Sequence, residues 1–484
     1  MANRRQWIVL ACSCLCAFSG NFFSEITTPL SRRLQGDSPA CRNSGSSTSA
    51  TTSTTSSSSE EKPPDHCLDL SSTEYNSLSA AFTYATGFLA VYSALAIKQY
   101  GQKWMIWSAA PLTVIGSFFF VGGSYLEDTT AAFSLLIIGR ILYGAGNGLR
   151  STVCGHRVNS LWKDSTLLKG LYILLARLGS ACAYLLNGAT LDAIGMSNAI
   201  WISVALTIAA ALAALIQGRI DSNEDKDGSE STLWDSTKKG YHQFRKHVES
   251  MYWWFAVAYF LVHVIISTFT SNAPTLLRGK GSYTEMEALY IISLVYDLSI
   301  FIPLIGFTVD KTGRRDYWMT LGTVFILTAF AAYLASDSFN SIIMTVLIGI
   351  GYAIFSPISS ASTSIVAPEH TRGVADAILK FLRYIGAGTF SLIAGGILDK
   401  TKEDTSDKEV WRYLIILLLV MAVIATVTSL GMIWGNRQTK EQPLNITEDE
   451  RRKKAHEKDG ESDERSHMAS SSFGASNKYS SLAS

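Results

Sequence analysis

Twelve nearly continuous apolar stretches recur along the chain, and they limit its fold more than any other feature. A helix of about 20 apolar residues crosses the hydrocarbon layer of a membrane, which is roughly 30 Å thick. Inside that layer only helices and closed barrels satisfy their own backbone polar groups. The stretches are solid and lack the polar–apolar alternation of barrel strands. We therefore predict an all-α polytopic membrane protein with twelve transmembrane helices, at residues 7–29, 75–97, 104–125, 131–154, 167–191, 197–219, 252–273, 284–308, 317–336, 341–365, 374–398 and 411–434.

The composition supports a protein of the lipid bilayer and argues against a soluble enzyme. Of the 484 residues, 48% are hydrophobic and 17% are charged, whereas a soluble domain carries about 25% charged residues. The formal net charge of +1 gives no indication of a nucleic-acid partner. The chain contains no GxSxG, HExxH, paired CxxC or phosphate-binding glycine loop. We predict that the protein is not an enzyme and has no catalytic residues, no metal and no cofactor.

A polar segment divides the helices into two sets of six. We expect a six-helix bundle at residues 1–220, a cytoplasmic linker at 221–250, a second six-helix bundle at 251–435 and a disordered cytoplasmic tail at 436–484. Lys and Arg gather in the short loops on one side of this array, and the short loops on the other side contain none. The positive-inside rule makes the first side cytoplasmic. Both termini then lie in the cytoplasm.

The loop between the first two predicted helices, residues 31–73, lies on the lumenal or extracellular side. Its run SGSSTSATTSTTSSSS cannot bury enough apolar surface to fold, so we expect a flexible loop suited to O-glycosylation. Cys41 and Cys67 flank this run and are the best disulfide candidates in an oxidising compartment. The one N-glycosylation sequon, at Asn445, lies in the predicted cytoplasmic tail, so no N-glycan is expected.

The two sets of helices carry an internal repeat. When the chain is shifted by 207 residues, residues 175–192 fall on residues 382–399 with two glycines, three leucines and an aspartate in register. A shift of 212 places VDKTGRR, residues 309–315, on IKQYGQK, residues 97–103. Both segments join two predicted helices. We interpret them as equivalent tight turns on the cytoplasmic side.

The pattern D-x-x-G-R-R in the second of these turns resembles the signature loop of the major facilitator superfamily. Asp310, Gly313, Arg314 and Arg315 match that pattern. The resemblance implies two pseudo-symmetric six-helix halves that rock about a central site. It also implies that the glycine makes the turn while the charged side chains form pairs that hold one access state. The first-half copy has Lys98 in place of the aspartate, which leaves the first-half latch in question; the alternative is a solvated turn that only obeys the positive-inside rule.

Three further stretches narrow the resemblance within that superfamily. ARLGS at 176–180, APEH at 367–370 and GRILYGAGNG at 139–148 are similar to the branch that contains lysosomal dipeptide transporters. The resemblance implies a carrier that moves dipeptides or amino-acid-like products out of the lysosome by alternating access. The alternatives are a major facilitator carrier for small organic anions or sugars, and a receptor or scaffold of the same fold that does not transport.

The location rests on two features. The tail ends in YSSL, and Tyr479 and Leu482 fit a tyrosine-based sorting motif. The resemblance implies that the protein lies in the lysosomal membrane. It also implies, as in the family, a glycosylated accessory membrane subunit that protects the carrier from proteases. We expect a multi-pass protein of the endolysosomal membrane rather than the plasma membrane.

Several ionisable side chains fall near the middle of the membrane when depth is counted along the predicted helices. A charge at that depth costs about 2.5–3.5 kcal/mol on insertion scales, so each needs a partner, water or a ligand. These ionisable side chains come from both halves. We therefore predict that the halves share one central cavity, in which a small-molecule substrate binds. The candidate binding residues are Arg140, Arg177, His263, Asp297 and Arg383, with Tyr84 and Tyr296 as walls of the cavity.

The expected roles differ among these residues. The resemblance implies that Arg177 faces the cavity and binds a substrate carboxylate, for which guanidinium offers a bidentate geometry. Arg383 is its near-equivalent in the second repeat, one position out of register. Asp297 either neutralises one of these arginines or holds a substrate amine.

The other candidates have structural alternatives. Arg140 matches a fourth-helix arginine of the family that usually bonds within the bundle. His263 is more often a packed, hydrogen-bonded residue than a proton switch. Tyr84 and Tyr296 occupy equivalent positions in the two repeats, where packing in the core is the alternative to lining a cavity. Glu25 lies near the predicted lumenal mouth and either acts as a gate or faces water.

One position departs from the dipeptide branch. That branch has a glutamate after a glycine pair in its fourth helix, suited to the amino terminus of a peptide, and this chain has Gly148 there. The amine-binding group is then either absent or supplied elsewhere, with Asp297 as the expected substitute. Without such a group, a site of arginines favours anions.

Overall fold

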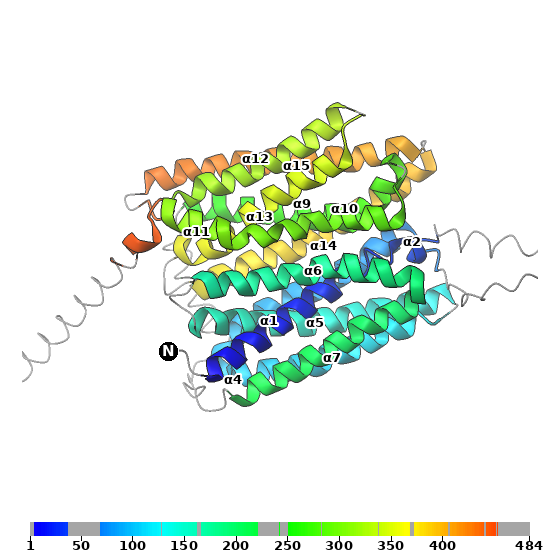
Figure 1. Cartoon of the computed structure of the whole chain (residues 1–484), viewed down its shortest axis with the longest axis horizontal. Helices are drawn as coiled ribbons and strands as arrows, with labels where there is room; N and C mark the ends of the chain where they lie inside the picture. Colours follow the sequence, from blue (N-terminus) through cyan, green and yellow to red (C-terminus); the bar gives the residue numbers. More distant parts are fainter. Residues whose placement is uncertain are drawn as a thin grey trace, which may run out of the picture.

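A computed structural model describes residues 4–36, 68–126, 128–161, 166–220, 242, 250–281, 283–336, 338–367, 372–404, 407–439, 442–451 and 453. Twelve helical segments in these ranges are long and apolar enough to cross a membrane, which confirms the predicted number. The helices run side by side along one direction and form a single bundle (Figure 1). The helices of the first half are α1 (Arg4–Ser24), α2 (Ser31–Leu34), α4 (Ser72–Gly123), α5 (Thr129–Leu161), α6 (Thr166–Ile194) and α7 (Met196–Ile220).

The second half contains the remaining helices. Its eighth span is not one regular helix, because a 3₁₀ turn, η1, separates α10 from α11, and Pro303 follows that turn at the start of α11. Proline lacks the N–H that a continuous helix would use there. The elements of this half are α9 (Ser250–Gly281), α10 (Glu285–Asp297), η1 (Leu298–Phe301), α11 (Ile302–Thr312), α12 (Arg315–Ala335), α13 (Ser341–Val366), α14 (Arg372–Asp404) and α15 (Asp407–Gln438).

The two predicted tight turns lie at one end of the bundle. Gly101 interrupts α4 with a φ of 77°, so α4 contains two of the membrane spans. Gly313 ends α11 with a φ of 63°, and Arg314 follows in the left-handed region with a φ of 51°. Glycine adopts positive φ at little cost, which explains its place in both turns. We call this end the Gly313 end and the opposite one, which carries α2, the α2 end.

The halves meet along two helix pairs. Helix α14 packs against the first part of α4, and α10 packs against α6. In Figure 1 the second-half helices, coloured green to orange, lie above those of the first half, coloured blue to green, with α14 and α6 at the boundary between them. The space between the halves is therefore bounded by helices from both copies of the repeat.

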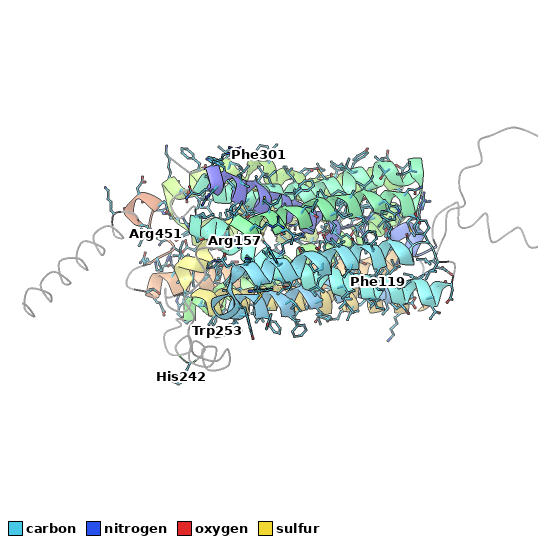
Figure 2. All side chains as sticks on the ribbon, turned by 90° about the horizontal axis from the view of Figure 1, so that it is seen from below. Phe119, Arg157, His242, Trp253, Phe301 and Arg451 are labelled. Carbon is cyan, nitrogen blue, oxygen red and sulfur yellow. The ribbon has the colours of Figure 1, made fainter. Side chains whose placement is uncertain are left out.

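The outer surface of the bundle is apolar. Phe119, Trp253 and Phe301 lie on different helices with exposed fractions of 37%, 49% and 51%, and their side chains stand among the sticks that cover the bundle in Figure 2. A soluble protein rarely exposes large contiguous apolar areas. This surface is the one expected to face lipid.

Two polar segments are more ordered than the sequence analysis expected. At the borders of the 31–73 loop, Leu70 donates its N–H to the carbonyl of Leu34 at 2.7 Å, and both side chains are buried. In the tail expected to be disordered from residue 436, α15 continues to Gln438 and residues 442–451 pack on the Gly313 turn. Leu444 is fully buried there. A single leucine in a charged segment gave no periodic signal, so its docking was missed.

Candidate functional site

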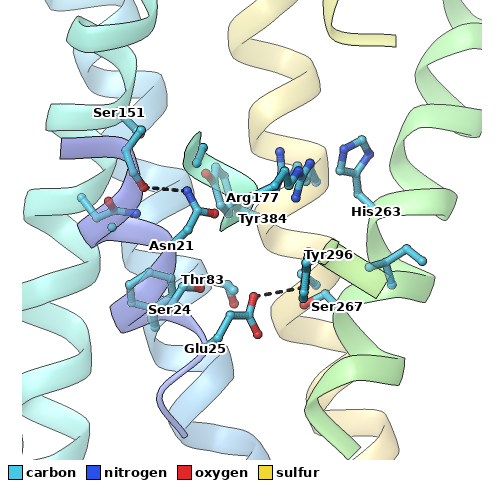
Figure 3. A pocket seen from close by; sticks show the side chains of 18 of the residues that line it. Asn21, Ser24, Glu25, Thr83, Ser151, Arg177, His263, Ser267, Tyr296 and Tyr384 are labelled. Atoms are coloured by element: carbon cyan, nitrogen blue, oxygen red, sulfur yellow. Dashed lines mark hydrogen bonds between the residues drawn. The ribbon is translucent and has the colours of Figure 1, made fainter. Parts of the chain in front are cut away.

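A cavity of about 130 Å³ lies between the halves near the middle of the bundle. At roughly 10–15 Å³ for each water, this is space for about ten water-sized groups, the scale of a small dipeptide or an organic acid. Helices α1, α4, α5 and α6 line it from the first half, and α9, α10, α13 and α14 from the second. Figure 3 shows its side chains at two levels: Arg177, Tyr384 and His263 at one, and Glu25, Ser267 and Tyr296 at the other.

Glu25 forms the acidic end of the cavity. It follows directly after α1, where the helix gives way to a turn, and its N–H still donates to the carbonyl of Asn21 at 3.2 Å. Its two carboxylate oxygens accept hydrogen bonds from the hydroxyls of Tyr184 at 2.8 Å and Tyr296 at 3.2 Å. The two tyrosine rings stack with centroids 5.9 Å apart. Because each carboxylate oxygen has two lone pairs, Glu25 keeps capacity to accept a further donor.

Arg177 and Arg383 form the basic end. Arg177 is buried on α6, where Nη2 donates to the hydroxyl of Ser356 on α13 and the guanidinium lies 4.5 Å from the centroid of the Tyr352 ring. This side chain therefore connects the two halves. Arg383 on α14 lies 5.3 Å from the ring centroid of its neighbour Tyr384. A guanidinium over an aromatic face gains about 0.5–2 kcal/mol but keeps its N–H groups free for a ligand in the plane.

His263 lies on α9 at the same level. Its Nδ1 is 2.8 Å from the carbonyl oxygen of Tyr259 one turn earlier. A carbonyl only accepts, so Nδ1 carries the proton and Nε2 of the neutral ring is an acceptor. Nε2 is buried and has no partner among the described residues. His263 is packed by Tyr259 and Tyr352, as the structural alternative expected, and it also lines the cavity with one free acceptor.

Arg150 and Asn147 line the cavity from α5, and the sequence analysis did not select them. They lie one helical turn apart, and Arg150 Nη2 is 3.4 Å from Asn147 Oδ1. A Cβ at Gly20 on α1 would lie 2.4 Å from Asn147 Oδ1 and 3.0 Å from Arg150 Nη2. The glycine therefore gives both side chains the room they occupy. The i, i+3 spacing of two polar residues within GAGNGLR was the signal available in the sequence.

Arg140 lies outside the cavity and has a structural role. Its Nε, Nη1 and Nη2 donate to the backbone carbonyls of Leu78, Phe23 and Ser24 at distances of 3.1, 2.9 and 3.0 Å. The guanidinium also lies 4.6 Å from the centroid of the Phe82 ring. It joins α5 to α1 and α4 and is 1% exposed. These contacts agree with the structural alternative for Arg140, in which it bonds within the bundle and does not bind substrate.

Three other candidate positions do not line the cavity. Tyr84 is bonded through its hydroxyl to Thr389 Oγ1 at 3.0 Å, a contact between the halves. Asp297, at the end of α10, accepts a hydrogen bond from Ser293 Oγ at 2.7 Å. Gly148 packs on α4, where an added Cβ would meet the carbonyl oxygen of Thr86 at 2.4 Å. The acidic group in the cavity is therefore Glu25 and neither Asp297 nor a residue at position 148.

The matched charges of the Gly313 turn form a cluster with the tail. Arg315 Nη2 pairs with Asp310 Oδ1 at 3.0 Å and with Glu448 Oε2 at 3.2 Å. A Cβ at Gly313 would lie 2.4 Å from the carbonyl oxygen of Asn445, so the glycine allows the tail to approach. Arg314 supplies the left-handed residue at the start of α12.

The α2 end is closed by polar contacts between the halves. Asp399 on α14 accepts the N–H groups of Ser72 and Thr73, both at 2.7 Å, and so caps the first turn of α4. The amides of Asn76 and Asn272 bond to each other at 3.1 and 3.2 Å. The other cross-half contacts at the α2 end are Arg32 to Glu285 at 3.0 Å and the Tyr75 hydroxyl to the carbonyl of Ser271 at 2.9 Å.

Some predicted features lie outside the described residues. These are the disulfide candidates Cys41 and Cys67 and the sorting motif at Tyr479 and Leu482. The cysteines that are described are all free. The described part of the chain contains no group of three or more His, Cys, Asp or Glu side chains placed to hold a metal ion.

The chain is similar in sequence to named transporters and similar in fold to solved transporter structures. The lysosomal dipeptide transporter MFSD1 of Danio rerio is 28% identical over 312 residues, which are 59% of this chain and 65% of that protein, just under two thirds of its length. The protein of the same name from Homo sapiens is 24% identical over 355 residues, 69% of this chain and 73% of the relative. A crystal structure of a POT family transporter in complex with 5-aminolevulinic acid superposes with a TM-score of 0.63 at 13% identity, covering 87% of this chain and 96% of that one.

The family model of the Major Facilitator Superfamily matches residues 10–388 and 282–471, which together take in most of the chain. The twelve spans of this chain, its two related halves and the glycine turns at one end of the bundle agree with that match. The chain belongs to the major facilitator superfamily of membrane transporters.

Proposed function

We propose that this transporter carries dipeptides across the lysosomal membrane, from the lumen to the cytosol, by alternating access. One observation carries the proposal: a cavity between the halves is lined by the carboxylate of Glu25 and by guanidinium groups of both halves, with Glu25 and Arg177 at different levels (Figure 3). A dipeptide has the matching pair of charges, an ammonium group at one end and a carboxylate at the other. The relatives named as dipeptide transporters support this substrate class.

The residues of the cavity fit the two ends of such a solute. Arg177 and Arg383 bind the carboxylate, because guanidinium offers parallel N–H donors to its two oxygens. Glu25 binds the ammonium group with the lone pairs that Tyr184 and Tyr296 leave unused. His263 Nε2 accepts a hydrogen bond from the peptide N–H between them.

The contacts between the halves support alternating access. The α2 end, which the positive-inside rule places in the lumen, is held closed by Asp399, by the asparagine pair and by Arg32. Opening this end requires these few hydrogen bonds to break while each half moves as a body. Arg177 and Ser356 bond across the halves beside the bound solute, so binding at this point is coupled to their relative position.

The lysosomal location and the partner are part of the same proposal. The relatives from Danio rerio and Homo sapiens are named as lysosomal. Because no N-glycan is expected on the lumenal loops, a glycosylated accessory membrane subunit would cover them. Purification of the tagged chain from lysosomes, followed by identification of co-purifying glycoproteins, tests for that subunit.

The test is transport by the purified protein in proteoliposomes. Labelled alanyl-alanine, a labelled dicarboxylate and a labelled hexose are supplied separately to wild type, Arg177→Ala and the control Arg412→Gln, which removes an exposed arginine on α15. We expect uptake of the dipeptide alone by wild type and the control. The loss of a buried charge partner costs about 2 kcal/mol or more, so Arg177→Ala should reduce uptake about thirtyfold or more.

The alternatives give different results in the same experiment. Uptake of the dicarboxylate or the hexose without the dipeptide would show a carrier of organic anions or sugars. Binding of a solute without any uptake would show a receptor of transporter shape. Equal dipeptide uptake by wild type and Arg177→Ala would remove the proposed binding site.

A further inference from the structure

The charges that line the cavity do not balance. Among the described residues that line it, Arg150, Arg177 and Arg383 are cationic and Glu25 is the one acid. Lys380, a turn from Arg383, lies outside this balance because Asp376 pairs with it at 2.8 Å. The cavity therefore has an excess of two positive charges, which a zwitterionic dipeptide leaves unchanged.

Arg150 is a buried cation with few compensating groups. It is 1% exposed, and its Nη1 has no partner among the described residues. Its side-chain hydrogen bond is to the neutral amide of Asn147 and is long, at 3.4 Å. The thiols of Cys16 and Cys154 also line the cavity. A buried charge without an anionic partner is costly, so an anion beside Arg150 would be favourable.

The surroundings of Arg150 are built to hold its guanidinium at the cavity. Gly20 leaves the space that a Cβ would take from Asn147 and Arg150. Arg150 belongs to α5, whereas Arg177 and Arg383 belong to α6 and α14, so the three cations reach the cavity from three directions. A solute with two separate carboxylates can meet all of them.

We propose that Arg150 binds a side-chain carboxylate of the substrate, and that this transporter prefers dipeptides that contain aspartate or glutamate. The inference rests on the proposed dipeptide transport and names the class of dipeptide. The terminal carboxylate meets Arg177 and Arg383, the ammonium group meets Glu25, and the acidic side chain meets Arg150 and Asn147. Such a dipeptide carries a net charge of −1 and removes part of the positive excess.

The test compares two dipeptides of nearly equal size, alanyl-glutamate and alanyl-glutamine, as competitors of labelled alanyl-alanine uptake into proteoliposomes. A hydrogen bond to a charged group contributes more free energy of binding than a neutral one. We therefore expect wild type to prefer alanyl-glutamate over alanyl-glutamine by about tenfold. Arg150→Gln should reduce that preference, measured as the ratio of the competition constants of the two peptides, to about twofold or less. Arg150→Lys keeps the charge and should keep most of the preference, and Arg412→Gln serves as the control for charge loss outside the cavity.

The outcomes separate this inference from the proposed function. Equal competition by the two peptides in wild type overturns the inference while dipeptide transport stands, and this measurement decides the matter even if Arg150 variants fail to fold. A folded Arg150→Gln protein that loses competition by both peptides equally also overturns it, because Arg150 would then be a structural residue. If wild type transports no dipeptide at all, the proposed function fails and the inference fails with it.

Discussion

Two buried arginines of the first half show how one type of side chain serves two different purposes. Arg140 donates three hydrogen bonds to backbone carbonyls of its own half and lies over Phe82. Arg177 makes one hydrogen bond to a described residue, the Ser356 hydroxyl of the other half. Guanidinium has five N–H donors. Arg140 uses most of them to hold three helices together, and Arg177 has most of them left for a solute.

This difference shows that burial of a charge does not by itself indicate a binding site. The number of donors that the protein already satisfies is the better guide, because a saturated guanidinium gains little from a ligand. By this criterion Arg150 belongs with Arg177, since one of its nitrogens has no partner in the described part of the chain.

The largest expected effect is the loss of stability in Arg140→Ala. The substitution removes the three hydrogen bonds that Arg140 donates to the carbonyls of Leu78, Phe23 and Ser24. A hydrogen bond to a charged group contributes about 1.5–3 kcal/mol, so the cost is about 3 kcal/mol or more. Thermal melting of purified protein should show a large decrease for Arg140→Ala and a much smaller one for Arg177→Ala. An Arg140→Ala protein that melts like wild type but does not transport would place this arginine with the binding residues.

The next effect concerns position 148, where this chain has a glycine and the dipeptide branch that it resembles has a glutamate. A Cβ there would lie 2.4 Å from the carbonyl oxygen of Thr86, so Gly148→Ala should destabilise the protein by about 1–3 kcal/mol. Gly155 on the same helix has nothing within 4 Å of an added Cβ. Gly155→Ala should be neutral or stabilise by up to about 1 kcal/mol. Equal melting temperatures for the two variants would show that α5 and α4 are not in this close contact.

A smaller effect is expected at the α2 end. Asp399→Asn weakens the cap on the first turn of α4, at a cost of about 0.5–2 kcal/mol. Hydrogen exchange of the Ser72 and Thr73 amides should become severalfold faster, and the apparent affinity for dipeptide should change because the halves separate more easily at this end. The control is Asp128→Asn, which weakens a cap on α5 within one half and should change local exchange without changing transport. Identical effects of both variants on transport would argue against a cross-half latch.

The smallest effect is expected at the Gly313 turn. Glu448→Gln removes one of the two carboxylates around Arg315 and leaves Asp310 in place. Both carboxylates are partly exposed, and the buried Arg315 keeps Asp310 as a partner, so the loss is about 1 kcal/mol or less. Melting should therefore change by a few degrees at most. A loss of folded protein would show that the tail segment is essential to the fold.

The sequence was sufficient for the spans. Solid apolar stretches set the twelve helices, and two glycines marked the equivalent turns. Of the residues predicted to line a central cavity, four line the cavity of the structure, Arg177, His263, Tyr296 and Arg383, and three do not, Arg140, Asp297 and Tyr84. Their proposed roles in binding remain predictions.

The direction in which a helical residue points was not available from the sequence. Arg140 and Arg150 lie ten residues apart on α5, which is about 15 Å along the axis and roughly 80° around it. The first contacts α1 and α4, and the second reaches the cavity. Helix rotation is set by packing against neighbouring helices, so only the fold decides between them. The sequence likewise left open whether Glu25 acts as a gate or faces water. In the structure the turn after α1 directs its side chain inward to Tyr184 and Tyr296.

The central claim is that the two ends of a dipeptide are bound by opposite charges, its ammonium group by Glu25 and its carboxylate by Arg177. Competition by alanyl-alanine, N-acetyl-alanyl-alanine and alanyl-alanine amide should be measured for wild type, Glu25→Gln and Arg177→Ala. In wild type each blocking group should weaken competition by about tenfold or more. Coupled groups give non-additive losses, so acetylation should matter little in Glu25→Gln and amidation should matter little in Arg177→Ala. Losses that simply add in every combination would contradict the account.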